Sequence, residues 1–320
     1  MRLIVGAWNP GGAPGRLVEV DPGESRTREL ASSSAVAIAE GRGGVIYTAG
    51  PEGVAAWSRD ADGVHPLGER YSSQGTLACH VAVTADGAHA IAAHYDGGLV
   101  TVHPIAADGS LGPVSDVAQL QGAGPDRQRQ EAAHPHMVWC GLDGEVLVTD
   151  LGADLVRRFR LEEGRLVAAS QIRVPAGTGP RHLVVLDGLA LVVGELADTL
   201  IAVDLGAEQV LHVEPCGADG LGGSSPSAIT LSADRQRCHV LRRGPDTIAT
   251  FSLGPRPRLL GQSPCGGQWP WDLAVAGGLL YVANQRSGTV AVLRTDPVSG
   301  LPVPAGEGLS VPDATSLLVV

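Results

Sequence analysis

The sequence contains no lysine, so every basic side chain is an arginine. The formal net charge is −11 over 320 residues. An acidic chain without a basic cluster argues against binding to nucleic acid or to anionic membrane surfaces. A small anionic substrate stays possible, because a few arginines can bind an anion locally.

Long hydrophobic runs are also missing. None approaches the ~20 residues that a membrane-spanning helix needs. The opening MRLIVGAWNPGG has no extended apolar region followed by a small-residue cleavage site, so no signal peptide is expected. We therefore expect a cytoplasmic protein without a membrane partner.

Cysteine is scarce and shows no framework pattern. The five cysteines are an odd number, and no two form a CxxC motif. This argues against a disulfide framework and against a structural zinc site. Buried thiols in a reducing compartment are the expectation.

Short strand patterns fill the chain, and no long amphipathic helix is predicted. Residues 134–163 and 180–205 share one order: a strand, a tight turn, a second strand with a small or polar end, a Gly/Asp turn and a third strand. Asp-Gly pairs at 86–87, 143–144 and 187–188 suit hairpin turns that require positive φ.

This unit recurs with a period of about 45 residues, which is typical of a β-propeller. When the repeats are aligned, two positions recur in every repeat, and we call each set of equivalent residues a column. Each column has seven residues, and one interval between successive residues is longer than the others, at the same place in both columns. We interpret them as seven blades, since six would leave one aligned segment unexplained. The start of each first strand gives Ser34, Cys79, His136, Arg181, Ser227, Trp271 and Asp313, and the end of each second strand gives Trp8, Gly50, Tyr95, Leu151, Glu195, Arg243 and Gln285.

The two ends of the chain fit a closed all-β ring. RLIVGAW reads as a second strand and ATSLLVV as a first strand, so the C-terminal strand would complete the N-terminal blade and leave no open edge. We expect one domain over residues 1–320. The longer step comes from a polar insertion at 119–133, either a flap over one rim or a solvated surface loop.

The columns predict a candidate site. First and second strands run antiparallel and first strands line a propeller's channel, so both columns converge around one mouth. His136, Arg181, Glu195 and Arg243 there form a candidate catalytic cluster. Solvated strand ends with inter-blade ion pairs are the alternative. The expected substrate-binding residues around the cluster are Trp8, His94, Tyr95, Asp150, His182, Trp271 and Gln285.

Several motifs resemble one family. HPHMV, GPRHLVV, VVGEL, VLRRGPDTIATF and GGQWPWDLAV resemble the seven-bladed lactonase family, which includes 6-phosphogluconolactonase and fungal carboxymuconate cyclase. The resemblance covers nearly the whole chain. It implies lactone hydrolysis in carbohydrate metabolism, with His136, Arg181, Glu195 and Arg243 as the active site.

Two positions depart from the family's usual pattern. Trp271 stands where the family usually has arginine, and His94 where it tends to have asparagine. The loss of an arginine weakens the case for a phosphorylated sugar. The tryptophan favours a flatter or more apolar substrate.

The cluster suits metal-independent lactone hydrolysis. Glu195 or His136 can take the proton of a water molecule, while Arg181 and Arg243 hold the carbonyl oxygen or a substrate carboxylate. A cyclase or isomerase acting on a carboxylate-bearing substrate is one alternative, and a non-catalytic binding module is another.

No cofactor is expected. A metal site would need His134 and His136 together with Glu195 and His182, and the neighbouring arginines disfavour a cation there. The expected partner is a small, anionic substrate. We expect a monomer or a weak homo-oligomer, since a closed propeller buries its own core.

Overall fold

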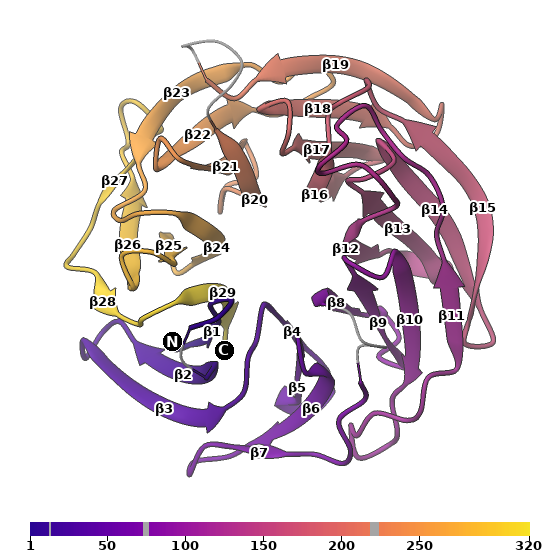
Figure 1. Cartoon of the computed structure of the whole chain (residues 1–320). Coiled ribbons are helices and arrows are strands. Elements are labelled where there is room, and N and C mark those ends of the chain that lie inside the picture. Colours follow the sequence, from indigo (N-terminus) through magenta and orange to yellow (C-terminus); the bar gives the residue numbers. More distant parts are fainter. Residues whose placement is uncertain (13, 73–76, 218–223) are drawn as a thin grey trace. The chain divides into compact units, whose positions relative to one another are not determined.

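The computed structural model describes residues 1–12, 14–72, 77–217 and 224–320. In this part of the chain, seven antiparallel sheets follow one another along the sequence and no α-helix occurs (Figure 1). The two short 3₁₀ turns are η1 (Arg42–Gly44) and η2 (Leu142–Gly144). None of these described elements is a helix long and apolar enough to cross a membrane. The all-β prediction is confirmed.

Two compact units divide the chain. Residues 30–179 form one unit, and residues 1–29 with 180–320 form the other. The first of these holds three sheets, β4–β7, β8–β11 and β12–β15. Their strands are β4 (Ala37–Glu40), β5 (Ile46–Gly50), β6 (Gly53–Arg59), β7 (Val64–Pro66), β8 (Ala78–Val83), β9 (His89–His94), β10 (Leu99–Pro104), β11 (Asp116–Gln119), β12 (Pro135–Cys140), β13 (Glu145–Asp150), β14 (Leu155–Glu162) and β15 (Arg165–Arg173).

The other unit holds four sheets, one of which joins the two ends of the chain. That sheet contains β29 (Ala314–Val319), β1 (Leu3–Ala7), β2 (Arg16–Asp21) and β3 (Arg26–Ser32) in that order. The remaining strands are β16 (Pro180–Leu186), β17 (Leu189–Gly194), β18 (Thr199–Asp204), β19 (Gln209–Pro215), β20 (Ser225–Leu231), β21 (Arg237–Arg243), β22 (Thr247–Ser252), β23 (Leu259–Pro264), β24 (Pro270–Ala276), β25 (Leu279–Asn284), β26 (Thr289–Thr295), β27 (Pro302–Pro304) and β28 (Leu309–Ser310).

The C-terminal strand completes the N-terminal blade, as the sequence predicts. β29 pairs antiparallel with β1, and Leu3 faces Val319 at one end of the ladder. The backbone N–H groups at the start of β1 thus find their partners more than 300 residues away in sequence. This pairing covers the edge of β1 that β2 leaves open.

Within each unit, neighbouring sheets pack face to face through their apolar middle strands. Leu3 and Val5 of β1 share a buried cluster with Tyr281 and Ala283 of β25. Strands buried on both faces read as continuous apolar runs, as in LLYVAN of β25. The middle strands therefore fix the ends of each hairpin, where the polar residues stand.

Two of the three Asp-Gly turns have the predicted backbone. Asp143 and Gly144 both have positive φ, at 55° and 74°, and Asp187 and Gly188 behave alike. At 86–87 only the glycine has positive φ. Asp86 instead accepts a hydrogen bond from the Thr84 hydroxyl at 2.6 Å, which stabilises a different turn.

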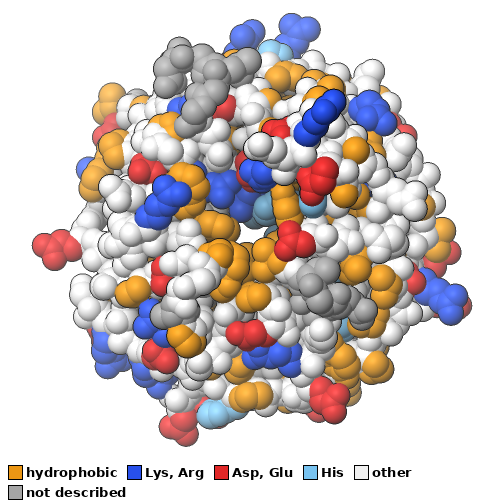
Figure 2. Space-filling view, in the orientation of Figure 1, with side chains coloured by type: hydrophobic (Ala, Val, Ile, Leu, Met, Phe, Trp, Pro, Cys, Tyr) orange, Lys and Arg blue, Asp and Glu red, His pale blue; other side chains and the backbone are white. Residues whose placement is uncertain are grey.

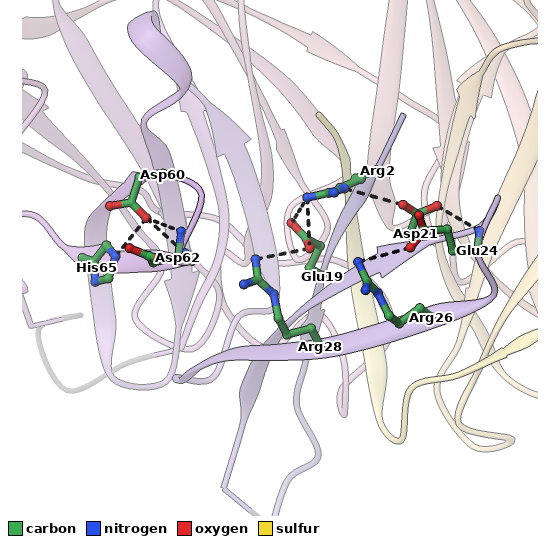
Figure 3. A network of polar contacts seen from close by, with 10 residues as sticks. Arg2, Glu19, Asp21, Glu24, Arg26, Arg28, Asp60, Asp62 and His65 are labelled. Atoms are coloured by element: carbon green, nitrogen blue, oxygen red, sulfur yellow. Dashed lines mark hydrogen bonds and ion pairs between the residues drawn. The ribbon is translucent and has the colours of Figure 1, made fainter.

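The outer strands are polar and carry exposed ion pairs. Figure 3 shows Glu19 of β2 between Arg2 and Arg28, at 3.4 and 3.3 Å. Glu19 itself is buried. The pair of Arg26, on the outer strand β3, with Glu24 at 3.2 Å is exposed on both sides and contributes roughly 0–1 kcal/mol. The outer strands are thus a solvated boundary, whereas the inner strand ends carry the candidate site.

The insertion at 119–133 is anchored to its own unit by Gln130. This side chain is fully buried and donates to the Leu151 carbonyl at 2.9 Å and to Asp154 Oδ1 at 2.8 Å. Its own Oε1 accepts from the Asp126 N–H at 3.2 Å. The insertion is therefore a folded loop with a defined fixing point.

Candidate functional site

Five inner strands have a β-bulge at the predicted column, namely β8, β12, β16, β20 and β24. In β12 the register shifts between Pro135 and Met137, and in β24 it shifts between Pro270 and Asp272. A bulge leaves one residue out of the ladder and re-aims its side chain, which is common beside active sites. The column residues at these shifts are Cys79, His136, Arg181, Ser227 and Trp271.

Two members of the first predicted column are displaced from it. In β29 the shift lies between Ala314 and Ser316, so Thr315, and not Asp313, stands at the bulge. Ser34 lies before its strand β4 begins. The alignment was wrong at these two positions because the extra bulge residue has no signature in the sequence.

Three of the four predicted catalytic residues meet in one buried cluster. Arg181 comes from β16, Glu195 directly follows β17, and Arg243 ends β21. Glu195 Oε2 lies 3.0 Å from Arg181 Nε and 3.1 Å from Arg243 Nη2. All three residues are less than 10% exposed. Two guanidinium groups and one carboxylate thus meet at a site largely screened from water.

Backbone contacts fix one of the two arginines. Arg243 Nε donates to the Ser225 carbonyl at 2.8 Å, at the start of β20. A buried charge is stable only when it is paired and hydrogen-bonded. This anchoring gives Arg243 one orientation toward Glu195.

Tryptophan side chains border this cluster. The Trp271 ring centre lies 5.3 Å from Arg243 Cζ and 6.0 Å from Arg181 Cζ, within the range of cation–π contact. Trp8 packs edge-on against Trp271 with centroids 6.5 Å apart. Gln285 donates to the Trp8 carbonyl at 2.9 Å. Of the predicted substrate-binding residues, Trp271 therefore adjoins the arginine–glutamate cluster, Trp8 adjoins Trp271, and Gln285 adjoins Trp8.

Asp272 is a site neighbour that the sequence columns missed. Its Oδ2 accepts from the Leu317 N–H at 2.8 Å, and its Oδ1 accepts from the Leu273 N–H at 2.9 Å. Burial raises the pKa of Asp272 to about 6, while these N–H groups and the charge of Arg181 act in the opposite direction. In the sequence, the signal for Asp272 is its position directly after Trp271, a residue of the first column.

The fourth predicted catalytic residue, His136, lies in the unit of residues 30–179, in a group of aromatic rings. Tyr95 meets His136 edge-on at 5.7 Å and stacks on His134 at 4.4 Å. Two insertion residues join this group. Arg129 donates to the Tyr95 hydroxyl at 3.3 Å, and Glu131 lies 3.1 Å from His134 Nε2. Sequence reasoning did not identify these two contacts.

Two predicted substrate contacts are fully enclosed. Asp150 holds Arg157 through two hydrogen bonds to Oδ2, at 2.9 and 2.7 Å, and accepts from the His134 N–H at 2.8 Å. His94 Nε2 lies 2.9 Å from the Thr101 hydroxyl. Neither side chain offers a surface to a ligand, so we leave both out of the proposed site. His182 is half-buried on β16.

Within the described ranges, no three His, Cys, Asp or Glu side chains converge as a metal-binding group. Burial raises the pKa of the Cys140 and Cys238 thiols to about 12. Thiols with such pKa values are protonated at neutral pH and are poor nucleophiles.

Comparison with known proteins gives matching results for sequence and structure. The family described as "Lactonase, 7-bladed beta-propeller" matches residues 19–319. The 6-phosphogluconolactonase of Bacillus subtilis is 30% identical over 268 residues, which are 78% of this chain and 76% of that protein.

Two solved structures share the fold over almost the full length. A protein from Lactobacillus plantarum has a TM-score of 0.89 and 26% identity, with 99% of this chain and 98% of that chain covered. The periplasmic gluconolactonase of Pseudomonas aeruginosa has a TM-score of 0.87 and 24% identity, with the same coverage. The seven sheets are thus the seven blades of a β-propeller fold, as predicted.

Proposed function

The chain belongs to the lactonase family of seven-bladed β-propellers, and on that premise we propose that it hydrolyses a small lactone at the cluster of Arg181, Glu195 and Arg243. The observation that carries the proposal is the Glu195 carboxylate, buried and shared by two guanidinium groups. The Bacillus subtilis relative named 6-phosphogluconolactonase supports the reaction class.

Lactone hydrolysis requires two kinds of group. A base must remove a proton from the water that attacks the carbonyl carbon, and must return a proton to the ring oxygen when the ring C–O bond breaks. Donors must stabilise the negative charge that develops on the carbonyl oxygen. We assign the base to Glu195, a role that contributes about 10²–10⁴ in rate. Each guanidinium has five N–H donors, so Arg181 and Arg243 can bind Glu195 and the carbonyl oxygen together. A single oxyanion donor is worth about 10²–10³ in rate.

The sequence also predicts His136, in the unit of residues 30–179, as a base. It stands on the bulge of β12, with Tyr95 against its ring edge. An imidazole can remove a proton from water and is the most common general base in enzymes. A His136→Ala variant with full activity would leave Glu195 as the base.

The substrate class follows from the borders of the cluster. The guanidinium N–H groups of Arg181 and Arg243 can bind an anionic group of a substrate. Trp271 and Trp8 offer flat apolar surface, which favours a planar ring such as an unsaturated lactone. We propose a small anionic lactone.

A pH-indicator hydrolysis screen tests this proposal. The panel contains sugar lactones with and without phosphate and unsaturated lactones with and without a carboxylate, each with and without EDTA. We expect turnover of at least one anionic lactone, unchanged by EDTA. If the folded protein hydrolyses no lactone, the proposal fails. In that case, lactone formation from an unsaturated dicarboxylate tests the cyclase alternative.

A further inference from the structure

A second tryptophan, Trp269, stands two residues before Trp271 in an unusual backbone conformation. Its φ is 61°, in the left-handed region that bulky side chains rarely adopt. Gly179 has the corresponding place in another blade, with φ 60° and a proline after it. The Trp269 N–H donates to Asp246 Oδ1 at 2.8 Å, and the Gly179 N–H donates to Asp154 Oδ1 at the same distance. The turn itself therefore does not need the indole.

Two arginines flank the half-buried indole of Trp269. Arg286 Cζ lies 3.4 Å from its ring centre, and Arg243 Cζ lies 5.6 Å from it. Arg243 is in turn 5.3 Å from the ring centre of Trp271. Arginines and tryptophans thus alternate, beginning with the exposed Arg286 and leading to the buried cluster around Glu195.

The charge of Arg286 is available to a ligand. The side chain is exposed, and no carboxylate of the described residues forms an ion pair with it. Stacking on an indole uses the face of a guanidinium group and leaves the N–H donors at its edge accessible. That planar edge matches a carboxylate or a phosphate through two parallel hydrogen bonds.

We propose that Arg286, positioned by Trp269, binds the carboxylate or phosphate group of the lactone substrate. This inference rests on the proposed function, because the lactone ring is assigned to the cluster of Arg181, Glu195 and Arg243. Trp269 is a positioning residue, since its indole contacts both Arg286 and Arg243 and so sets the place of the anion beside the cluster. The strained backbone at Trp269 is consistent with a functional role for its side chain.

Kinetics on charge-matched substrates test Arg286. We compare wild type with R286Q and with the control R294Q, which removes an exposed arginine of β26. Each protein is assayed on two substrate pairs that differ in charge. One pair is a sugar lactone with and without phosphate, and the other is a carboxymethyl lactone and its methyl ester. We expect R286Q to raise KM for the anionic member of one pair by about tenfold or more, with kcat and the neutral member little changed. The affected pair identifies the anion. Equal KM changes for charged and neutral members, no change, or the same loss in R294Q would overturn the inference.

Trp269→Gly tests the positioning role. This variant places at position 269 the residue that the equivalent turn already has at Gly179, so the backbone can keep its conformation. We expect the same selective rise in KM as in R286Q, with kcat retained and an unchanged circular dichroism spectrum. A variant that keeps its KM for the anionic lactone would show that Trp269 does not position Arg286.

Ligand binding separates this inference from the proposed function. Tryptophan fluorescence is titrated with glucose 6-phosphate against glucose, and with the carboxymethyl lactone against its methyl ester. If wild type hydrolyses no lactone, the proposed function fails. The inference then still requires tighter binding of one charged ligand, weakened about tenfold in R286Q. Charge-independent binding, or no binding, would overturn it.

Discussion

At the scale of single residues, the site depends on a few charged groups held in one arrangement. Glu195 is paired with two arginines that belong to different blades, one of which is fixed by a backbone carbonyl. The repeat predicted these three residues because strand ends recur at fixed spacing. It did not predict Asp272, Trp269 or Arg286, because their contacts depend on bulges and stacking that leave no periodic signal.

Asp272 gives the protein a specific pH dependence of stability. Its folded pKa of about 6 lies above the ordinary value of 3.8. Between these values the folded state holds a proton that the unfolded chain releases, so this group lowers stability as pH rises from about 4 to about 6. Asp272→Asn cannot ionise. We expect the melting temperature of wild type minus that of Asp272→Asn to decrease as pH rises from about 4 to about 6.

Differential scanning calorimetry from pH 4 to pH 8 measures this difference. A constant difference between the two melting temperatures over the whole range would contradict the assigned pKa. The comparison is made at each pH, so the titration of all other groups is common to both proteins.

At the scale of elements, the strands were predictable and their exact registers were not. Apolar periodicity and Asp-Gly turns locate the hairpins, as at Asp143–Gly144. A bulge in an inner strand adds one residue without changing the composition of the strand. The sequence alignment therefore placed Asp313 in the first column, whereas Thr315 stands at the bulge. The insertion at 119–133 is visible as an irregular polar stretch, but its anchor could not be read from the sequence.

Gln130→Ala should loosen the insertion. The substitution removes the side-chain donor from the Leu151 carbonyl and one of the two donors of Asp154 Oδ1, which keeps the Gly179 N–H. An unsatisfied buried group costs about 1–3 kcal/mol. Because the chain lacks lysine, trypsin cleaves only after arginine, and Arg127 and Arg129 lie in this loop. We expect faster tryptic cleavage there in the variant. The control is the exposed Gln128→Ala, and equal cleavage rates in both variants would contradict the anchoring role.

At the scale of the whole molecule, charged side chains of both signs lie on the surface of the described residues (Figure 2). Figure 2 shows acidic and basic side chains mixed over the described part of the face drawn, without a continuous basic patch. The seven-bladed fold and its closure by β29 were predicted from period and chain ends alone, because both follow from the recurrence of one strand pattern. The sequence also predicts a single domain over residues 1–320.

Thermal unfolding tests that single domain. We expect one cooperative calorimetric transition, with a van't Hoff enthalpy equal to the calorimetric enthalpy. Two separate transitions would instead indicate that residues 30–179 unfold apart from the remainder of the chain.

The most direct test of the central claim is the steady-state activity of Glu195→Gln on the lactone that wild type hydrolyses best. The control is Glu307→Gln, which removes an exposed carboxylate from the same unit. With folding verified by circular dichroism, we predict that kcat/KM falls at least about 10²-fold in Glu195→Gln and stays unchanged in Glu307→Gln. Activity of Glu195→Gln within a few-fold of wild type would contradict the assignment of this cluster as the hydrolytic site.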